Sequence, residues 1–273
     1  MLLCIDVGNS QTVIGLFDRR ITSIKPSNSS ARDGLRKHWR ISTVADRTAD
    51  EYAVILNQLM ALEGLRISAD IDAVAISSVV PSVTTALKEL DRVIFGGAAL
   101  VLSPSFGVEI DDNYSNVKEI GPDRIANSIG VFDIYHSRAI VVDFGTATTY
   151  DIVSSQGRYM GGVILPGIEL GLKALFTKAA ALGTIELKVP PKVIGTSTTE
   201  SIQSGATYGV AAQVDGMCQR LRSEIGDCIV VTTGGLSELI SPLCQVDNYH
   251  EPFLTLHGLR VSYERHMGQG NSQ

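Results

Sequence analysis

Two short stretches of the chain have residues that could bind phosphate, and each begins with an aspartate. Asp6 and Asp143 each end an apolar run, and each is followed by one residue, a glycine, and then small hydroxyl or amide residues. The glycine leaves backbone N–H groups uncovered, so the turn can hold the oxygens of an oligophosphate. A carboxylate repels phosphate unless a cation lies between them, so this arrangement implies a bound metal.

A single Asp-x-Gly turn is weak support for this chemistry. An aspartate at the end of a strand commonly binds the backbone of its own turn, and for one copy this structural explanation is the better one. The two copies, however, lie 137 residues apart in a chain of 273. That offset is about half of the chain, as expected for a duplicated domain, and it favours a phosphate site that is built twice.

The composition narrows the class of protein. Hydrophobic residues make up 44% of the chain, which is typical of a soluble globular protein. The formal net charge of −6 provides no positive field for nucleic acid or an anionic membrane. Asp6 interrupts the first apolar run, and the four cysteines have no C-x-x-C spacing. We therefore expect no signal peptide, membrane span, disulfide framework or zinc site, and a cytoplasmic location.

The elements around the two turns repeat in the same order. The residues around Asp6 predict a strand, a tight turn and a second strand, and the first half as a whole predicts the order β-β-β-α-β-α-β. The second half begins again with strand, turn and strand at 139–153. We therefore expect an α/β fold of two domains, 1–118 and 119–273, each a mixed sheet flanked by helices.

A third candidate segment is Gly121-Pro122-Asp123-Arg124. Proline is favoured where a helix begins, so this segment predicts the start of a helix that runs to about Tyr135. Asp123 then lies in the first turn, where an acidic residue stabilises a helix by about 0.3–1 kcal/mol. The other interpretation is a general base for phosphoryl transfer, which the helix end is expected to keep ionised. Position alone favours the first interpretation.

A long helix is predicted from Gly195-Thr196-Ser197-Thr198-Thr199 to about Ile225. Gly205 and Gly209 lie four residues apart on it, and each costs about 1 kcal/mol relative to alanine. Close approach of a neighbouring backbone, within the subunit or across a dimer, would offset that cost.

Over nearly its full length, the chain resembles the type III pantothenate kinases, a family in the superfamily of acetate kinases, sugar kinases, actin and a class of heat-shock chaperones. Asp6-Val7-Gly8-Asn9-Ser10 resembles the first phosphate motif of the family, with serine in place of threonine, and Asp143 to Ala147 matches the second in full. Thr233-Gly234-Gly235 resembles the adenosine motif. Gly121 to Arg124 matches the segment that holds pantothenate and supplies the base.

This resemblance implies two duplicated ribonuclease H-like domains of the actin-like ATPase type around an interdomain cleft. It implies a homodimer that phosphorylates pantothenate to 4'-phosphopantothenate, the first step of coenzyme A biosynthesis, by direct transfer from ATP with Asp123 as general base. Mg²⁺ and a monovalent cation, K⁺ or NH₄⁺, are the implied ions. The implied ATP-binding residues are Asp6, Val7, Gly8, Asn9, Ser10, Gln11, Thr12, Val13, Thr146, Gly234 and Gly235.

The resemblance also implies roles for the remaining site residues. Asp143 would bind the monovalent cation, and Asp6 would bind Mg²⁺ through water. Arg124 suits the carboxylate of pantothenate, although a lone arginine more commonly forms a surface salt bridge. Tyr114 and Thr198 would add hydrogen bonds, and each alone could equally be structural. The implied substrate-binding residues are Tyr114, Gly121, Pro122, Asp123, Arg124 and Thr198.

Two other functions stay open. The chain could be another small-molecule kinase of the superfamily, which the Gly-Pro-Asp-Arg and Ser201–Gly205 segments argue against. It could instead be a regulatory protein that keeps the ATPase core without its chemistry. A degenerate chain should have lost its carboxylates, and Asp6, Asp123 and Asp143 are all present.

Overall fold

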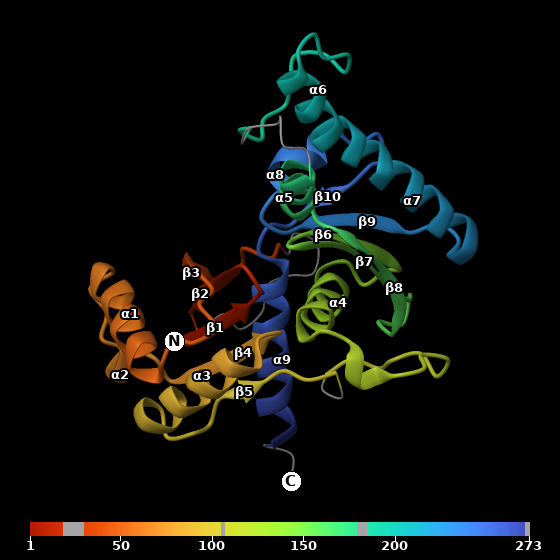
Figure 1. Cartoon of the computed structure of the whole chain (residues 1–273). Helices are drawn as coiled ribbons and strands as arrows, with labels where there is room; N and C mark the ends of the chain where they lie inside the picture. The colour runs from red at the N-terminus through yellow and green to blue at the C-terminus, as the bar shows by residue number, and fades with distance from the viewer. Residues whose placement is uncertain (19–29, 105–106, 179–184, 271–273) are drawn as a thin grey trace. The chain divides into compact units, whose positions relative to one another are not determined.

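The computed structural model describes residues 1–18, 30–104, 107–178 and 185–270 (Figure 1). Contacts divide the chain into two compact units, the first formed by Met1–Tyr135 with Phe253–Gln273 and the second by His136–Pro252. The aspartates of the repeat therefore lie in different units. The division differs from the expected boundary after residue 118, because the helix that follows Gly121 and the terminal helix both pack in the first unit.

The first unit is built on a mixed sheet of five strands in the order β3-β2-β1-β4-β5. Strands β1 and β2 form an antiparallel hairpin, and β1 is parallel to β4. The predicted order of strands and helices is confirmed, with short α2 and η2 in addition. The elements are β1 (Leu2–Val7), β2 (Gln11–Phe17), β3 (Leu35–Ser42), α1 (Ala49–Leu62), α2 (Ile67–Asp70), β4 (Ala73–Ser78), α3 (Pro81–Ile94), β5 (Leu100–Val101), η2 (Val117–Glu119), α4 (Pro122–Tyr135) and α9 (Leu254–Gly270).

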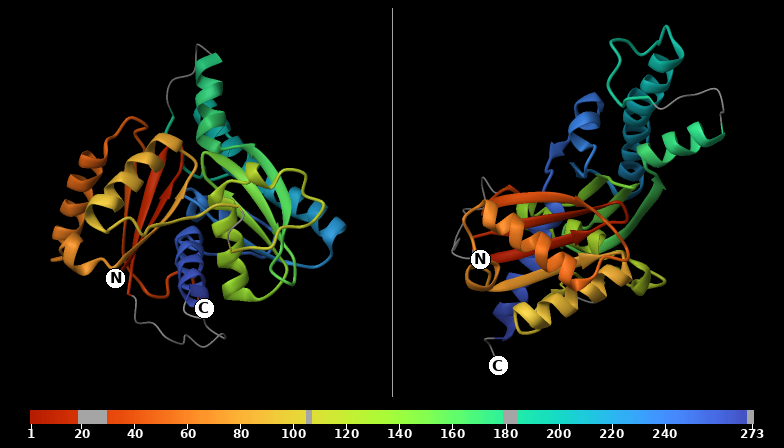
Figure 2. Two further views of the ribbon diagram at one scale, coloured as in Figure 1. Left: turned by 90° about the horizontal axis from the view of Figure 1, so that it is seen from below. Right: turned by 60° about the vertical axis from the view of Figure 1, so that its left-hand side comes forward.

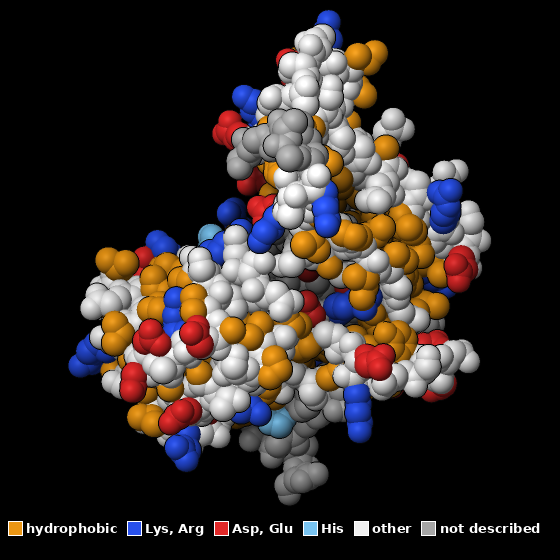
Figure 3. Space-filling model, in the orientation of Figure 1, with side chains coloured by type: hydrophobic (Ala, Val, Ile, Leu, Met, Phe, Trp, Pro, Cys, Tyr) orange, Lys and Arg blue, Asp and Glu red, His pale blue; other side chains and the backbone are white. Residues whose placement is uncertain are grey.

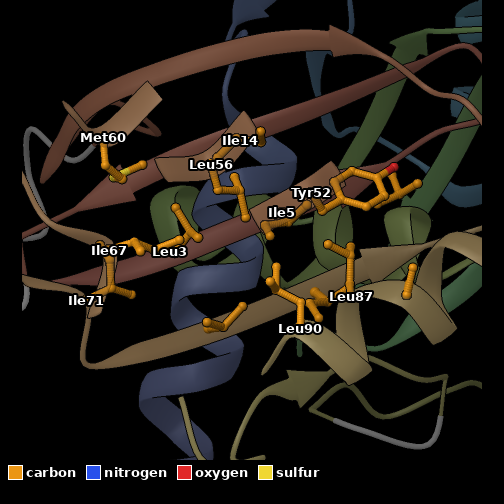
Figure 4. Packing of buried hydrophobic residues seen from close by; sticks show 14 of the residues in the cluster. Leu3, Ile5, Ile14, Tyr52, Leu56, Met60, Ile67, Ile71, Leu87 and Leu90 are labelled. Carbon is orange, nitrogen blue, oxygen red and sulfur yellow. The ribbon is translucent and has the colours of Figure 1, made fainter. Parts of the chain in front are cut away.

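One face of this sheet forms a hydrophobic core because side chains alternate along a strand. Leu3 and Ile5 of β1 pack there with Leu56 of α1 and Leu87 of α3 (Figure 4). Helices α4 and α9 pack in the same unit, with α4 against β4 and α9 against β1, β2 and β4, and Figure 2 shows α9 across the sheet from α1 and α3. The alternation places Asp6 on the face opposite the core.

Helices α4 and α9 approach each other closely at two glycines. A Cβ added to Gly258 would lie 1.8 Å from the carbonyl oxygen of Ala126, and one added to Gly130 would lie 2.8 Å from that of Leu254. The hydroxyl of Thr255 also donates to Oδ1 of Asn127 at 2.8 Å. This packing positions the helix that carries Asp123 in its first turn.

The second unit has the same strand order when its sheet, β10-β9-β6-β7-β8, is followed from the opposite edge. Strand β6 is antiparallel to β7 and parallel to β9, as β1 is to β2 and β4. The predicted duplication is therefore confirmed in the topology. The elements are β6 (Ala139–Phe144), β7 (Ala147–Val153), β8 (Tyr159–Pro166), α5 (Ile168–Lys178), α6 (Thr198–Ser204), η3 (Gly205–Gly209), α7 (Val210–Ile225), β9 (Ile229–Thr233), α8 (Ser237–Ile240), η4 (Ser241–Leu243) and β10 (Tyr249–His250).

The predicted long helix is divided into α6, the π-helical segment η3 and α7. Gly205 and Gly209 begin and end the π-helical segment. Within the described residues, nothing lies within 4 Å of a Cβ added to Gly205, and for Gly209 the nearest atom is the carbonyl oxygen of Ser204 at 3.9 Å. The close approach expected within the subunit is therefore wrong, and the approach across a dimer stays a prediction.

Candidate active site

The turn between β1 and β2 has an open tip and fixed flanks. The N–H of Gly8 donates to the carbonyl oxygen of Gln11 at 3.0 Å, and the N–H of Thr43 donates to that of Ser10 at 3.0 Å. The hydroxyls of Thr12 and Thr43 lie 2.9 Å apart. The three residues of the tip are exposed: Asn9, Ser10 and Gln11.

The other residues expected at the first phosphate turn lie in the sheet. Asp6 and Val13 pair across the hairpin and are partly buried. Val7 and Thr12 are 1% and 0% exposed, so the sheet buries both residues. Thr43 was not among the site residues predicted from the sequence. Its position directly after β3, the strand that pairs with β2, could have indicated it.

The turn between β6 and β7 is closed in by two glycines from other segments. Gly167 donates its N–H to the carbonyl oxygen of Thr146 at 3.1 Å, and a Cβ added to Gly167 would lie 2.3 Å from that oxygen. A Cβ added to Gly234 would lie 2.4 Å from Oδ1 of Asp143. The structure therefore brings the segment expected to bind adenosine against the turn expected to bind phosphate. In that segment Gly234 is partly buried and Gly235 is exposed. Gly167 was not predicted as a site residue.

Asp123 lies at the start of α4, as predicted, with a carboxylate that folds back on the chain. Its Oδ1 accepts the N–H of Arg124 at 2.9 Å, and a Cβ on Gly121 would lie 2.3 Å from the same oxygen. Burial raises the pKa of Asp123, and the Arg124 N–H and guanidinium offset this only in part. Burial therefore decides the direction of the pKa shift at this helix end, and the ionised state of Asp123 stays a prediction. A carboxylate with a raised pKa is a stronger proton acceptor, as a general base requires.

The residues expected around pantothenate divide between the units. Arg124 is only 8% exposed, so it is not the exposed surface arginine of the alternative interpretation. Tyr114 is partly buried in the first unit, where its N–H donates to the carbonyl oxygen of Asp111 at 2.9 Å. Thr198 is exposed at the start of α6 in the second unit.

A charged network lies between α4 and α9. Nε2 of His257 lies 3.0 Å from Oδ2 of Asp133, and Nδ1 lies 3.3 Å from Nη2 of Arg260. Because a guanidinium can only donate, Nδ1 accepts and Nε2 carries the proton that is donated to Asp133. Burial raises the pKa of Asp133, but the hydrogen bond from His257 and the charges of Arg265 and Arg260 outweigh it and lower the pKa.

The duplicated sheets and strand-end turns define the class of protein. Solved structures with the same fold include a glucokinase of the ROK family from Streptomyces griseus. It is 13% identical in sequence, the match covers 94% of this chain and 97% of that chain, and the TM-score is 0.51. They also include an activator of 2-hydroxyisocaproyl-CoA dehydratase from Clostridium difficile, with 13% identity, 99% and 97% coverage and a TM-score of 0.51. The chain thus has the two-domain, ribonuclease H-like fold of the actin-like ATPases and sugar kinases.

Sequence comparison assigns the family within this class. The type III pantothenate kinase profile matches residues 2–220. A type III pantothenate kinase from Streptomyces griseus is 44% identical over 98% of this chain and 100% of its own, and one from Moorella thermoacetica is 42% identical over 97% and 99%. The chain belongs to the type III pantothenate kinase family and is a phosphotransferase. No helix of the described residues is long and apolar enough to cross a membrane.

Proposed function

We propose that the protein transfers the γ-phosphoryl group of ATP to the primary hydroxyl of pantothenate and so catalyses the first step of coenzyme A biosynthesis. Family membership supports the substrate. The observation that carries the mechanism is Asp123, a carboxylate at the start of α4 whose pKa is raised by burial. Asp123 is the general base that accepts the hydroxyl proton as the bond to phosphorus forms.

The two turns hold the triphosphate. Backbone N–H groups at the exposed tip of the first turn, with the hydroxyl of Ser10 and the amide of Asn9, bind phosphate oxygens. Thr146 provides a hydroxyl from the second turn. Gly235 is exposed and has no side chain, so the adenosine can lie against its backbone, next to Gly234, which packs on the second turn.

The oxygen-rich ends of β1 and β6 fit hard cations. Asp6 and Asp143 are partly buried carboxylates beside the two turns, and Mg²⁺ and K⁺ take oxygen ligands. Asp6 would hold Mg²⁺ through water, and Asp143 would hold K⁺ or NH₄⁺. When bound, these cations neutralise charge on the phosphates.

Three residues recognise the acceptor. The planar guanidinium of Arg124 pairs with the carboxylate of pantothenate. Its buried position supports this role, because a guanidinium with little water around it forms a stronger ion pair. Tyr114 and Thr198 add hydrogen bonds from the first and second units.

A homodimer and a cytoplasmic location belong to the same proposal. Apolar side chains are exposed on the second unit (Figure 3), among them Ile164 at 63%, Val193 at 63% and Ile194 at 83%. A contiguous exposed apolar patch commonly marks a protein interface, and Val193 and Ile194 are adjacent in the chain. Sedimentation at micromolar concentration is expected to give a dimer, and a fully active monomer would contradict this assignment.

A coupled assay of ADP release tests the proposed reaction. The purified protein is given ATP and Mg²⁺ with pantothenate, acetate, glucose or no acceptor, with and without K⁺. We expect ADP only with pantothenate and K⁺, and mass spectrometry should show 4'-phosphopantothenate. Turnover of another acceptor alone would identify a different kinase of the superfamily, and binding of ATP without turnover of any acceptor would favour the regulatory function.

A further inference from the structure

Each unit has a buried hydroxyl beside the aspartate that ends its central strand. Asp6 is the parallel partner of Ser77 across β1 and β4, and Asp143 is the parallel partner of Thr233 across β6 and β9. Ser77 and Thr233 are 0% and 1% exposed. The two hydroxyls therefore occupy the same place in the duplicated fold.

The side chains of each pair lie on the same face of their sheet. The core of the first unit takes Ile5 of β1 and Ile76 of β4, so Asp6 and Ser77, one residue further along, face the other way. The core of the second unit takes Val142 of β6, and the same alternation places Asp143 and Thr233 on the opposite face. Neighbouring strands lie about 4.8 Å apart, so each hydroxyl stands beside its carboxylate.

Within the described residues, neither hydroxyl has a hydrogen-bond partner in the chain. The hydroxyls next to them do. Thr232 bonds Ser241 at 2.7 Å, and Ser78 bonds the hydroxyl of Thr84 at 2.8 Å. Because burial of an unpartnered hydroxyl costs free energy, a recurrence of this feature at both aspartates indicates partners that come from outside the chain.

The second unit gives an independent sign of what that partner is. A Cβ on Gly234 would lie 2.4 Å from Oδ1 of Asp143, so this carboxylate lies against the end of β9, where Thr233 is located. A carboxylate oxygen and a hydroxyl oxygen side by side form part of an oxygen ligand set for a cation.

We propose that Thr233 is a second protein ligand of the monovalent cation beside Asp143, and that Ser77 binds the water by which Asp6 holds the divalent cation. The assignment rests on the proposed cation roles of Asp6 and Asp143. It adds one residue to each cation site, and it explains why both are hydroxyl residues with no partner among the described residues.

Thermal unfolding without substrates tests Thr233. Melting temperature is measured against KCl at constant ionic strength, with choline chloride as replacement salt, for wild type, Thr233→Val, Thr233→Ser and Thr232→Val. For Thr233→Val we expect the half-saturating K⁺ concentration to rise about 10-fold, a typical effect of a metal-site neighbour, with no loss of stability in choline. Thr233→Ser should respond as wild type does. Thr232→Val should lower the melting temperature in both salts and leave the K⁺ midpoint unchanged.

Mn²⁺ provides the matching test of Ser77. Binding of Mn²⁺ with a non-hydrolysable ATP analogue is followed by electron paramagnetic resonance for wild type, Ser77→Ala and Ser78→Ala. Ser77→Ala should weaken Mn²⁺ binding about 10-fold, and Ser78→Ala should bind Mn²⁺ as wild type does.

Two results would overturn the assignment: an unchanged K⁺ midpoint in Thr233→Val, or unchanged Mn²⁺ binding in Ser77→Ala. A loss of stability in choline for Thr233→Val would also contradict it, because it would show a partner within the chain. These readouts need no turnover. If wild type phosphorylates pantothenate but the K⁺ midpoint of Thr233→Val is unaltered, this inference alone is refuted. If the midpoints are altered but the protein leaves pantothenate unmodified, the proposed reaction alone is refuted.

Discussion

The two units share a strand order and a strand-end aspartate, but they enclose their turns differently. The tip of the first turn is exposed, and among the described residues a Cβ on Gly8 would meet only the carbonyl oxygen of Gln11, at 3.2 Å. In the second unit, a Cβ on Gly167 or Gly234 would lie 2.3 Å or 2.4 Å from the nearest atom of the turn. Duplication has therefore kept the pairing of the strands and changed what packs on the turns.

The units also differ in the helices that accompany the sheet. Only the first unit contains the Gly-Pro-Asp-Arg segment, and its α4 is packed against α9 through glycines. In the proposed mechanism, the repeated parts supply the cation and phosphate ligands, and the unrepeated α4 supplies the base and the acceptor site.

Asp123→Asn tests this division of labour and should have the largest effect. We expect kcat to fall about 10²–10⁴-fold, the usual contribution of a general base. Because the pKa of Asp123 is raised in the folded state, the ionised carboxylate destabilises the fold at pH values above that pKa, and the cost disappears as the pH falls through it. The neutral amide should therefore unfold in urea at pH 7 no earlier than wild type.

The pH dependence of wild type should agree with the variant. On the acid side, kcat/KM should decrease with an apparent pKa above the ordinary aspartate value of 3.8. The control is Glu119→Gln, an exposed acid four residues earlier, which should keep both the rate and the profile. Near-normal kcat in Asp123→Asn would remove the base from the proposed mechanism.

Gly258→Ala tests the packing that positions α4. Its Cβ would lie 1.8 Å from the carbonyl oxygen of Ala126, so the two helices must separate, at a cost of about 2–3 kcal/mol in the free energy of unfolding. Urea denaturation measures this change. Gly268→Ala on the same helix meets nothing within 4 Å in the part of the chain that the structure describes and should leave stability unchanged or slightly raised. Equal effects of the two changes would contradict the packing argument.

Gly234→Ala and Gly8→Ala compare the two turns directly. Gly234 has a φ of +94° and no room for a Cβ, so its substitution should cost about 2 kcal/mol and weaken ADP binding. Gly8 needs a shift of only a few tenths of an ångström, and its substitution should cost less than about 1 kcal/mol. Both values come from urea denaturation, and ADP affinity from calorimetry. A larger effect at Gly8 would reverse the proposed difference between an open and an enclosed turn.

The sequence was sufficient for the repeated and locally encoded parts of the molecule. The helix at Pro122 and the strands around both aspartates depend on residues close in sequence, and their bounds agree with prediction. The capping box of Thr48 and Glu51 at the start of α1 is local in the same sense, because its two residues lie three positions apart.

Features that depend on distant contacts were not predictable in the same way. The terminal helix packs with the first unit because Gly258 meets Ala126, a pairing with no local signal. The raised pKa of Asp123 arises from tertiary burial, which outweighs the helix end. Several residues lie beside the turns only because distant strands pair or the chain folds back: Thr43, Gly167, Ser77 and Thr233.

Asp133→Asn should have the smallest effect and concerns the charged network found between α4 and α9. The lowered pKa of Asp133 means that its ionised form stabilises the fold at pH values above its unfolded pKa, and that this is lost as the pH falls through the folded pKa. Asp133 remains 34% exposed, so solvent screening limits the expected loss at pH 7 to about 1 kcal/mol. The difference from wild type in urea denaturation should be constant from pH 7 to about pH 5 and shrink below pH 4. Asp46→Asn, at an exposed position, serves as control. If the difference in unfolding free energy between Asp133→Asn and wild type grows on acidification, the carboxylate of Asp133 does not stabilise the packing of α4 on α9 in the first unit.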